Sequence, residues 1–147
     1  MDIDRHAPAV VEVERIIRAP LATLWNLHVD IAGWPRWNRH ISAASPHGPI
    51  GVGATFDWET EGLKITSTIS EYDPMRRIAW TGTASGIEAR HVWTFTPRSE
   101  QAALVHTAES WAGHPVRADP AAMRAALDGS LQGWLTALES ESERVTH

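Results

Sequence analysis

Five strand-like runs joined by short connections occupy the middle of the sequence. Apolar and polar residues alternate within them, which is typical of strands with one buried face. Short connections place consecutive strands antiparallel and side by side, so we expect one continuous antiparallel sheet. The five runs are Ala54–Thr60, Leu63–Tyr72, Arg77–Thr83, Ile87–Thr96 and Ala102–Trp111.

The pairing of these runs predicts which side chains share a face of the sheet. A two-residue turn at Ala84-Ser85 sets Trp80 opposite Ala89. The same construction at the other turns pairs Trp58 with Leu63, Ile69 with Ile78, Trp93 with Val105 and His91 with Thr107. A slip of one residue would turn a whole strand over, so the agreement between hairpins supports a single apolar face. That face holds Phe56, Trp58, Leu63, Ile65, Ile69, Ile78, Trp80, His91, Trp93, Phe95, Val105 and Trp111.

One long helix at the C-terminal end is available to cover this face. Asp119 and Pro120 form an N-cap followed by proline, and the helix is expected to run to about Glu143. Its large apolar residues recur at spacings of three and four, as on a buried helix face. They are Met123, Leu127, Leu131, Trp134 and Leu138. A stripe of small residues runs beside them: Ala122, Ala126, Gly129, Gly133 and Ala137.

The two glycines of this stripe are unfavourable for helix stability, so their presence needs an explanation. Each destabilises a helix by about 1 kcal/mol relative to alanine. We predict that Gly129 and Gly133 keep the helix thin where it borders a cavity. Close packing of the helix on the sheet is the alternative reason.

The chain before the sheet predicts a strand over Val10–Arg18 and a short helix over Leu21–Val29. A second short helix or turn follows within "AGWPRWNRH", where Trp34 and Trp37 lie three residues apart and share a side if the turn is helical. Both tryptophans could plug the end of the core or face a ligand. Asn38 is expected to be a turn or cap residue.

Composition excludes several classes of protein. The chain has 147 residues, a formal net charge of -5 and no cysteine. Thiolate chemistry and disulfides are therefore excluded. The sequence has no run of basic residues, which argues against non-specific nucleic-acid binding. Neither a signal peptide nor a membrane span is visible, so we expect a cytoplasmic protein. A monomer and a homodimer both remain open.

Four polar residues are expected on the inner face of the sheet: Ser67, His91, Thr107 and Glu109. Glu109 is placed opposite Ala89 and diagonal to His91. A histidine and a glutamate facing one cavity could act as an acid/base pair or orient a ligand carbonyl or phenol. Alternatively, Glu109 lies at a wet strand end and His91 bonds a neighbouring hydroxyl. We predict no metal and no cofactor, because no ligand spacing or phosphate-binding loop is present.

Four segments carry a resemblance to a known family. They are "IIRAPLATLW" (16–25), "WPRWN" (34–38), "EYDPMRRIAW" (71–80) and "HVWTFTP" (91–97). With the order of elements, they make the chain similar to the START-like or SRPBCC superfamily, often labelled polyketide cyclase/dehydrase. The resemblance implies an α+β helix-grip fold, in which a curved antiparallel seven-stranded sheet wraps around the C-terminal helix and two short helices follow the first strand. It also implies a single START-like domain over 1–147, with an ordered core of about 10–143.

Members of this superfamily bind ligands between the sheet and the long helix. Eight tryptophans in a small domain favour an aromatic or polycyclic ligand. Our first hypothesis is therefore a binding protein for a small hydrophobic molecule, and the alternative is a cyclase or dehydratase with His91 and Glu109 as weak catalytic candidates. A third possibility is an interaction module like the chaperone activators of the superfamily. The residues expected at the ligand are Trp37, Phe56, Trp58, Ile78, Trp80, His91, Trp93, Glu109, Trp111, Met123, Leu127 and Gly133.

Overall fold

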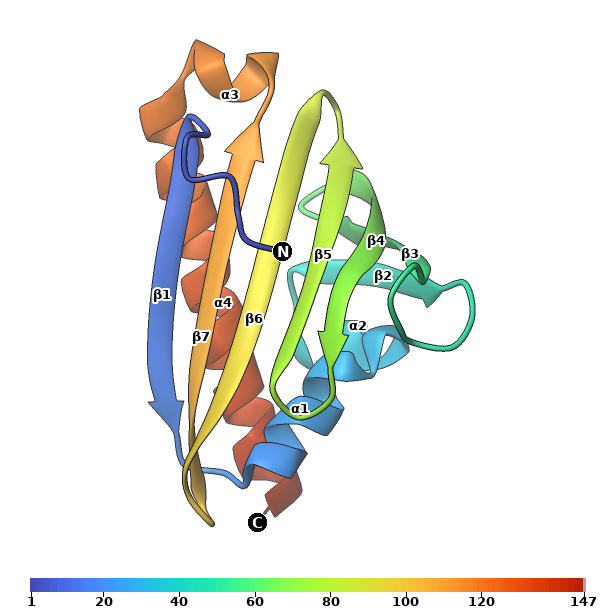
Figure 1. Ribbon diagram of the computed structural model, residues 1–147, viewed down its shortest axis with the longest axis vertical. Coiled ribbons are helices and arrows are strands. Elements are labelled where there is room, and N and C mark those ends of the chain that lie inside the picture. Colours follow the sequence, from blue (N-terminus) through green and yellow to red (C-terminus); the bar gives the residue numbers. More distant parts are fainter. Residues whose placement is uncertain (147) are drawn as a thin grey trace.

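The computed structural model describes residues 1–146 and contains a seven-stranded antiparallel sheet curved around a long helix (Figure 1). The strand order across the sheet is β1-β7-β6-β5-β4-β3-β2. The strands are β1 (Ala9–Ile17), β2 (Ile41–Pro46), β3 (Thr55–Thr60), β4 (Leu63–Asp73), β5 (Arg77–Ala84), β6 (Ile87–Ser99) and β7 (Ala102–Ala112). This confirms the predicted helix-grip architecture.

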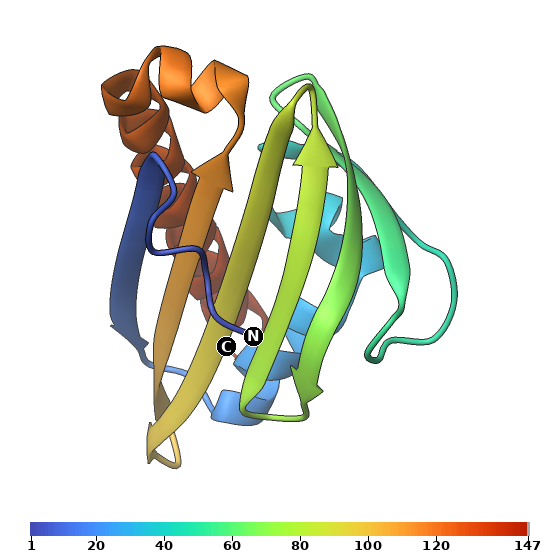
Figure 2. The same ribbon diagram turned by 45° about the horizontal axis from the view of Figure 1, so that its top comes forward.

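The helices lie on the concave side of the sheet or at its ends (Figures 1 and 2). They are α1 (Leu21–Val29), the 3-10 turn η1 (Ile31–Gly33), α2 (Trp34–Trp37), α3 (His114–Ala118) and α4 (Pro120–Thr146). Helix α4 packs along β1 and against α1 and α2. Among the strands, α4 packs mainly on β1, at one edge of the sheet. Large side chains such as Trp134 extend from α4 to the central strands.

The predicted pairings place every strand on the correct face, but each is displaced by two residues. Trp80 lies opposite His91 rather than Ala89, and Trp58 lies opposite Ile65. The physical reason is turn chemistry. The turn residues are Ser85-Gly86 and Glu61-Gly62, all at positive φ, so each turn sits one residue later than predicted. A shift of one residue in the turn moves the pairing by two and preserves the face.

The other two hairpins show the same displacement of two residues. In the β4–β5 hairpin the turn pairs Asp73 with Arg77, and a bulge between Ile69 and Glu71 then places Ile69 opposite Trp80 rather than Ile78. In the β6–β7 hairpin, Trp93 lies opposite Thr107 and His91 lies opposite Glu109, beyond a register shift near the turn. Glu109 is therefore the direct cross-strand neighbour of His91, closer than the diagonal position that the sequence predicted.

Two elements have no individual counterpart among the segments located from sequence. Strand β2 forms the edge of the sheet beside β3 and is mostly exposed, so its apolar pattern is weak. Helix α3 lies between the last predicted strand and the predicted C-terminal helix, and it begins directly after Gly113. Asn38 does form the predicted turn, since its Oδ1 accepts the backbone N–H of His40 at 3.1 Å.

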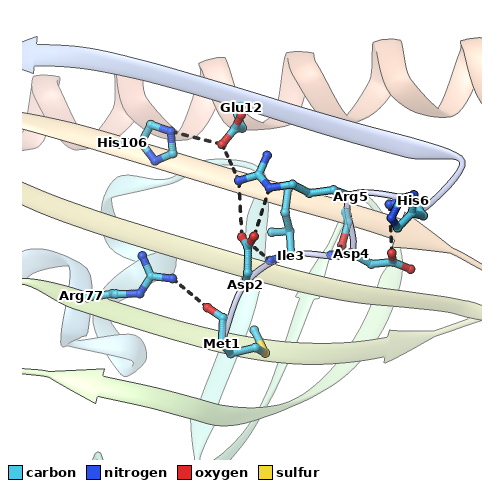
Figure 3. A network of polar contacts seen from close by, with 10 residues as sticks. Met1, Asp2, Ile3, Asp4, Arg5, His6, Glu12, Arg77 and His106 are labelled. Carbon is cyan, nitrogen blue, oxygen red and sulfur yellow. Dashed lines mark hydrogen bonds and ion pairs between the residues drawn. The ribbon is translucent and has the colours of Figure 1, made fainter.

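The N-terminal segment crosses the convex face of the sheet (Figure 3). Arg77 of β5 donates to the carbonyl oxygen of Met1 at 2.7 Å, and the backbone N–H of Asp4 donates to Ser110 Oγ at 2.9 Å. Between these anchors the side chain of Ile3 is buried in a small second core. Its buried neighbours there are Ala79, Val92 and Ala108. This segment is therefore part of the packed structure.

The large residues of α4 face inward as predicted, whereas the small-residue stripe is exposed at Ala122, Ala126 and Gly129 and half-buried at Gly133 and Ala137. Leu127, Leu131 and Trp134 are buried. Gly129 is exposed, and a Cβ added there would meet no atom within 4 Å. Gly133 is half-buried, and the nearest group to its added Cβ is the His40 ring at 3.8 Å. The interpretation of Gly129 as a cavity-bordering residue was wrong, because that position faces outward from the helix.

Candidate functional site

A cluster of aromatic rings occupies the inner face of the central strands. Trp80 and Trp93 lie on the same face, because Trp80 is paired with His91 and Trp93 is two residues further along β6. Phe56 contacts Trp80 edge to face, with ring centroids 5.6 Å apart. All three of these aromatic side chains are buried. The sheet therefore presents an aromatic surface toward α4, as its sequence pattern predicts.

Two tryptophans from the helices complete this cluster. Trp34 of α2 and Trp134 of α4 meet at a centroid distance of 5.1 Å. Trp134 also contacts Trp93 at 5.4 Å and Trp58 at 5.7 Å. The indole N–H of Trp34 donates to the carbonyl oxygen of His28 at 2.8 Å, which fixes α2 against α1. Indole rings thus fill the space between the sheet and the helix at the α1 end of the molecule.

His28 lies at the centre of this cluster, although sequence analysis did not propose it as a site residue. It projects from α1 and is fully buried. Its ring centroid is 4.2 Å from that of Trp93 and 5.8 Å from that of Trp80. Burial lowers the pKa of His28 to about 3, so the imidazole is neutral. The sequence feature that indicates burial of His28 is its helical spacing from Leu24 and Trp25, which places the imidazole on the buried face of α1.

A polar cross-strand group adjoins the aromatic cluster on β6 and β7. His91 Nε2 and Thr107 Oγ1 are 2.9 Å apart, and His91 Nδ1 lies 3.2 Å from Glu109 Oε1. The second contact is close, but it is not aligned as a hydrogen bond. The other carboxylate oxygen of Glu109 accepts the indole N–H of Trp111 at 2.8 Å. The structure therefore contains one feature of each arrangement considered from the sequence. His91 contacts the hydroxyl group of Thr107, and it also faces Glu109.

The electrostatics of this pair favour neutral groups. Burial raises the pKa of Glu109 to about 7, against the opposing effect of its hydrogen bond from Trp111. Burial, with a smaller effect of His28, holds the pKa of His91 well below its usual range. The Glu109 side chain is 12% exposed, so it is reachable from solvent, whereas His91 is enclosed. A carboxyl group that titrates near pH 7 beside an imidazole can donate or accept a proton.

Burial of the inner face decreases from the α1 end toward the α3 end. Ile78, Trp93 and Phe95, toward the α1 end, are buried. Toward the α3 end the inner-face residues are half-buried: Leu63, Ile65, Ile87, Ala89 and Trp111. Met123, near the start of α4, is half-buried as well. Glu109 lies between these two regions. These inner-face residues are therefore partly accessible to solvent, and we name this half-buried set the open end.

The residues expected at a ligand thus fall into distinct places. Phe56, Ile78, Trp80, His91 and Trp93 lie in the buried inner face, together with Trp58 at its margin. Glu109, Trp111 and Met123 belong to or adjoin the open end, and Leu127 packs with Val11 and Leu131. Trp37 joins the aromatic core, and Gly133 adjoins His40. Three other members of the aromatic cluster, His28, Trp34 and Trp134, were not among the residues expected at a ligand, although Trp34 was considered as a residue that could face one.

A separate hollow of about 170 Å³ lies beneath the connection between β2 and β3. Its apolar lining includes Ile31, Ile50, Phe56 and Ile69. Phe56 also belongs to the aromatic cluster, so this hollow touches the far side of the same core. No group of three or more His, Asp or Glu residues within 1–146 is arranged to hold a metal ion. Within the same residues, no helix is long and apolar enough to cross a membrane.

A curved antiparallel sheet around a long C-terminal helix, with two short helices after the first strand, defines the START-like class. The model for the polyketide cyclase / dehydrase and lipid transport family matches residues 8–143, and the chain belongs to this family. Among curated proteins, none matches the sequence.

Solved structures with this fold come from several organisms. A hypothetical protein from Helicobacter pylori is 22% identical, with a TM-score of 0.83 over 95% of this chain and 91% of its own. The Zhui aromatase/cyclase from Streptomyces is 18% identical, with a TM-score of 0.82 over 94% of this chain and 95% of its own. A START superfamily protein from Mycobacterium smegmatis is 13% identical, with a TM-score of 0.79 over 92% and 98%. At these identities the similarity establishes the fold.

Proposed function

We propose that this protein binds a small, uncharged aromatic or polycyclic molecule between the sheet and α4. The observation that carries the proposal is the aromatic inner face, which is followed by the half-buried open end with the polar group of His91, Thr107 and Glu109 between them. Aromatic side chains offer flat apolar surface for stacking or edge-to-face contact with a ligand ring. A globular protein rarely leaves an inner apolar face partly exposed without a use for it.

The ligand would enter at the open end and displace part of the indole packing. Trp111 and Met123 would be its first contacts, and Trp80 and Trp93 would lie deeper. Family membership supports a role in ligand binding or in cyclase chemistry. The titration described below is designed to identify the class of the ligand.

A second candidate function is acid/base catalysis on a polyketide-like substrate. It is favoured by the 3.2 Å approach of His91 Nδ1 to Glu109 Oε1 at the edge of the open end. In this role Glu109 would exchange a proton with a carbonyl or hydroxyl of the substrate, and His91 would orient the carboxyl group. Removing the carboxyl group in Glu109→Gln would then abolish turnover and leave binding of the same substrate intact.

Binding is tested by titrating the protein with polycyclic aromatics, flavonoids and fatty acids while tryptophan fluorescence is recorded. We expect saturable quenching by at least one planar aromatic compound and none by the fatty acids. Met123→Arg, which places a charge at the open end, should weaken that binding about tenfold or more. Ala122→Arg on the exposed side of the same helix is the matched control and should bind as the natural protein does. Absence of saturable quenching by every aromatic compound would contradict the proposal.

A further inference from the structure

Five buried side-chain nitrogens among residues 1–146 lack a hydrogen-bond partner. One is His91 Nδ1, which lies beside Glu109, and the other four meet inside the aromatic cluster. Both ring nitrogens of His28 and the indole nitrogens of Trp93 and Trp134 are buried without a hydrogen-bond partner. The three rings are mutual neighbours, with centroid distances of 4.2 Å, 5.9 Å and 5.4 Å. Buried polar groups in native proteins are nearly always hydrogen-bonded, so such a concentration requires an explanation.

Packing alone does not explain this choice of residues. The three side chains come from α1, β6 and α4, which are far apart in sequence and converge only in the fold. Apolar side chains would pack in this interior without burying a polar atom. Trp34, in the same cluster, does have a partner for its indole N–H, so an indole here need not be left unsatisfied.

We infer that the inner end of the proposed ligand site takes an uncharged hydroxyl or keto group of an aromatic ligand, held by the imidazole of His28 and the indole N–H groups of Trp93 and Trp134. This inference rests on the proposed function and adds the chemical class of the ligand. Two indoles supply two donors, and a neutral imidazole supplies one donor and one acceptor. That set matches a phenolic or keto oxygen.

The charge of the surroundings excludes an acidic group at this position. The buried polar residues among 1–146 include no lysine and no arginine. A carboxylate placed beside His28 would lose its hydration without meeting a cation, which is strongly unfavourable. A fatty acid could therefore bind only with its carboxylate directed toward the open end.

The three rings pack closely against one another. At a centroid distance of 4.2 Å, His28 and Trp93 are in contact, so a ligand oxygen enters only if the rings separate. Trp134 is the side chain placed to turn aside, because the backbone of α4 lies mainly along β1 and α1 and Trp134 reaches the central strands through its ring. Separating the rings weakens their apolar packing, and the ligand offsets this cost by forming hydrogen bonds that the closed form lacks.

The test uses 2-naphthol and 2-methylnaphthalene, which share a shape and differ in the hydroxyl group. Both are titrated into ¹⁵N-labelled protein, and the indole N–H signals are followed by heteronuclear NMR. We expect 2-naphthol to bind about tenfold more tightly and to shift the Trp93 and Trp134 indole signals downfield. His28→Phe and Trp93→Phe should each bring the affinity ratio of the two probes toward one. Trp25→Phe, a buried substitution whose ring contacts are Tyr72 and Phe95, is the control and should keep the ratio.

The outcomes separate this inference from the function on which it rests. Equal affinity of the two probes for the natural protein, with the Trp93 and Trp134 signals unshifted by either, overturns the inference and leaves the binding function standing. Binding of neither probe overturns both. Because the main comparison uses the natural protein, a variant that fails to fold does not affect the result.

Discussion

Replacing His28 with phenylalanine should change how the stability of the protein depends on pH. The pKa of His28 is lowered to about 3 in the folded protein, because the ring is buried without a charged partner. In the unfolded chain it returns to about 6.5. Below pH 6.5 the unfolded chain therefore binds a proton that the folded protein does not, and stability falls as the pH falls toward 3. Between pH 8 and pH 5 this linkage removes about 2 kcal/mol from the free energy of unfolding.

His28→Phe removes this contribution and keeps an aromatic ring in the cluster. His91 and Glu109 also have shifted pKa values, but both are present in both proteins, and burial, the main cause of each shift, is unchanged. The variant loses only the smaller effect of His28 on the pKa of His91. Urea unfolding followed by tryptophan fluorescence at pH 8 and pH 5 measures the difference. The natural protein should lose about 2 kcal/mol more than the variant between these two values. Trp25→Phe should follow the pH dependence of the natural protein. Parallel pH curves for the natural protein and His28→Phe would refute the assignment of His28 as a buried neutral imidazole.

Three further substitutions test other parts of the account. The pKa of Glu109 is raised to about 7, so stability falls as the pH rises from about 4.5 through 7. Glu109→Gln should therefore be more stable than the natural protein by up to about 3 kcal/mol at pH 8, with little difference at pH 4, and equal urea midpoints at pH 8 would contradict this. Gly129→Ala should raise stability by about 1 kcal/mol, because the added methyl group meets open space; a lower melting temperature would mean that the glycine is needed. Ile3→Ala should lower stability by about 2 kcal/mol, since it empties the small core on the convex face; an unchanged urea midpoint would show that the N-terminal segment is not packed there in solution.

The faces of the strands were predictable from sequence, whereas the exact pairings were not. The alternation of residues fixes which side chains share a face, so Trp80 and Trp93 could be placed together. The pairing depends on which residues adopt positive φ in each turn. At Ser85-Gly86 and Glu61-Gly62 a non-glycine residue does so, and assigning the turn one residue early displaced the pairings by two. The edge strand β2 was not located because an exposed strand has little apolar alternation.

The candidate site was predictable only where it lies on the sheet. The inner-face tryptophans and the neighbourhood of His91 and Glu109 follow from strand alternation. His28, Trp34 and Trp134 reach the same place from three helices, and their convergence depends on how those helices pack. A helical pattern shows that a residue is buried but does not show which other residues it meets. The position of Gly129 was also predicted wrongly, because the packing of α4 leaves this residue exposed. The burial of the large apolar stripe of α4 was predicted correctly.

The central claim is that a small aromatic molecule occupies the space between the sheet and α4. Native mass spectrometry tests it most directly, on protein freshly purified and then incubated with the aromatic panel. The account predicts a one-to-one complex with at least one aromatic compound, weakened by Met123→Arg and retained by Ala122→Arg. Only the mass of the free chain in every sample, or complexes equally populated in both variants, would contradict it.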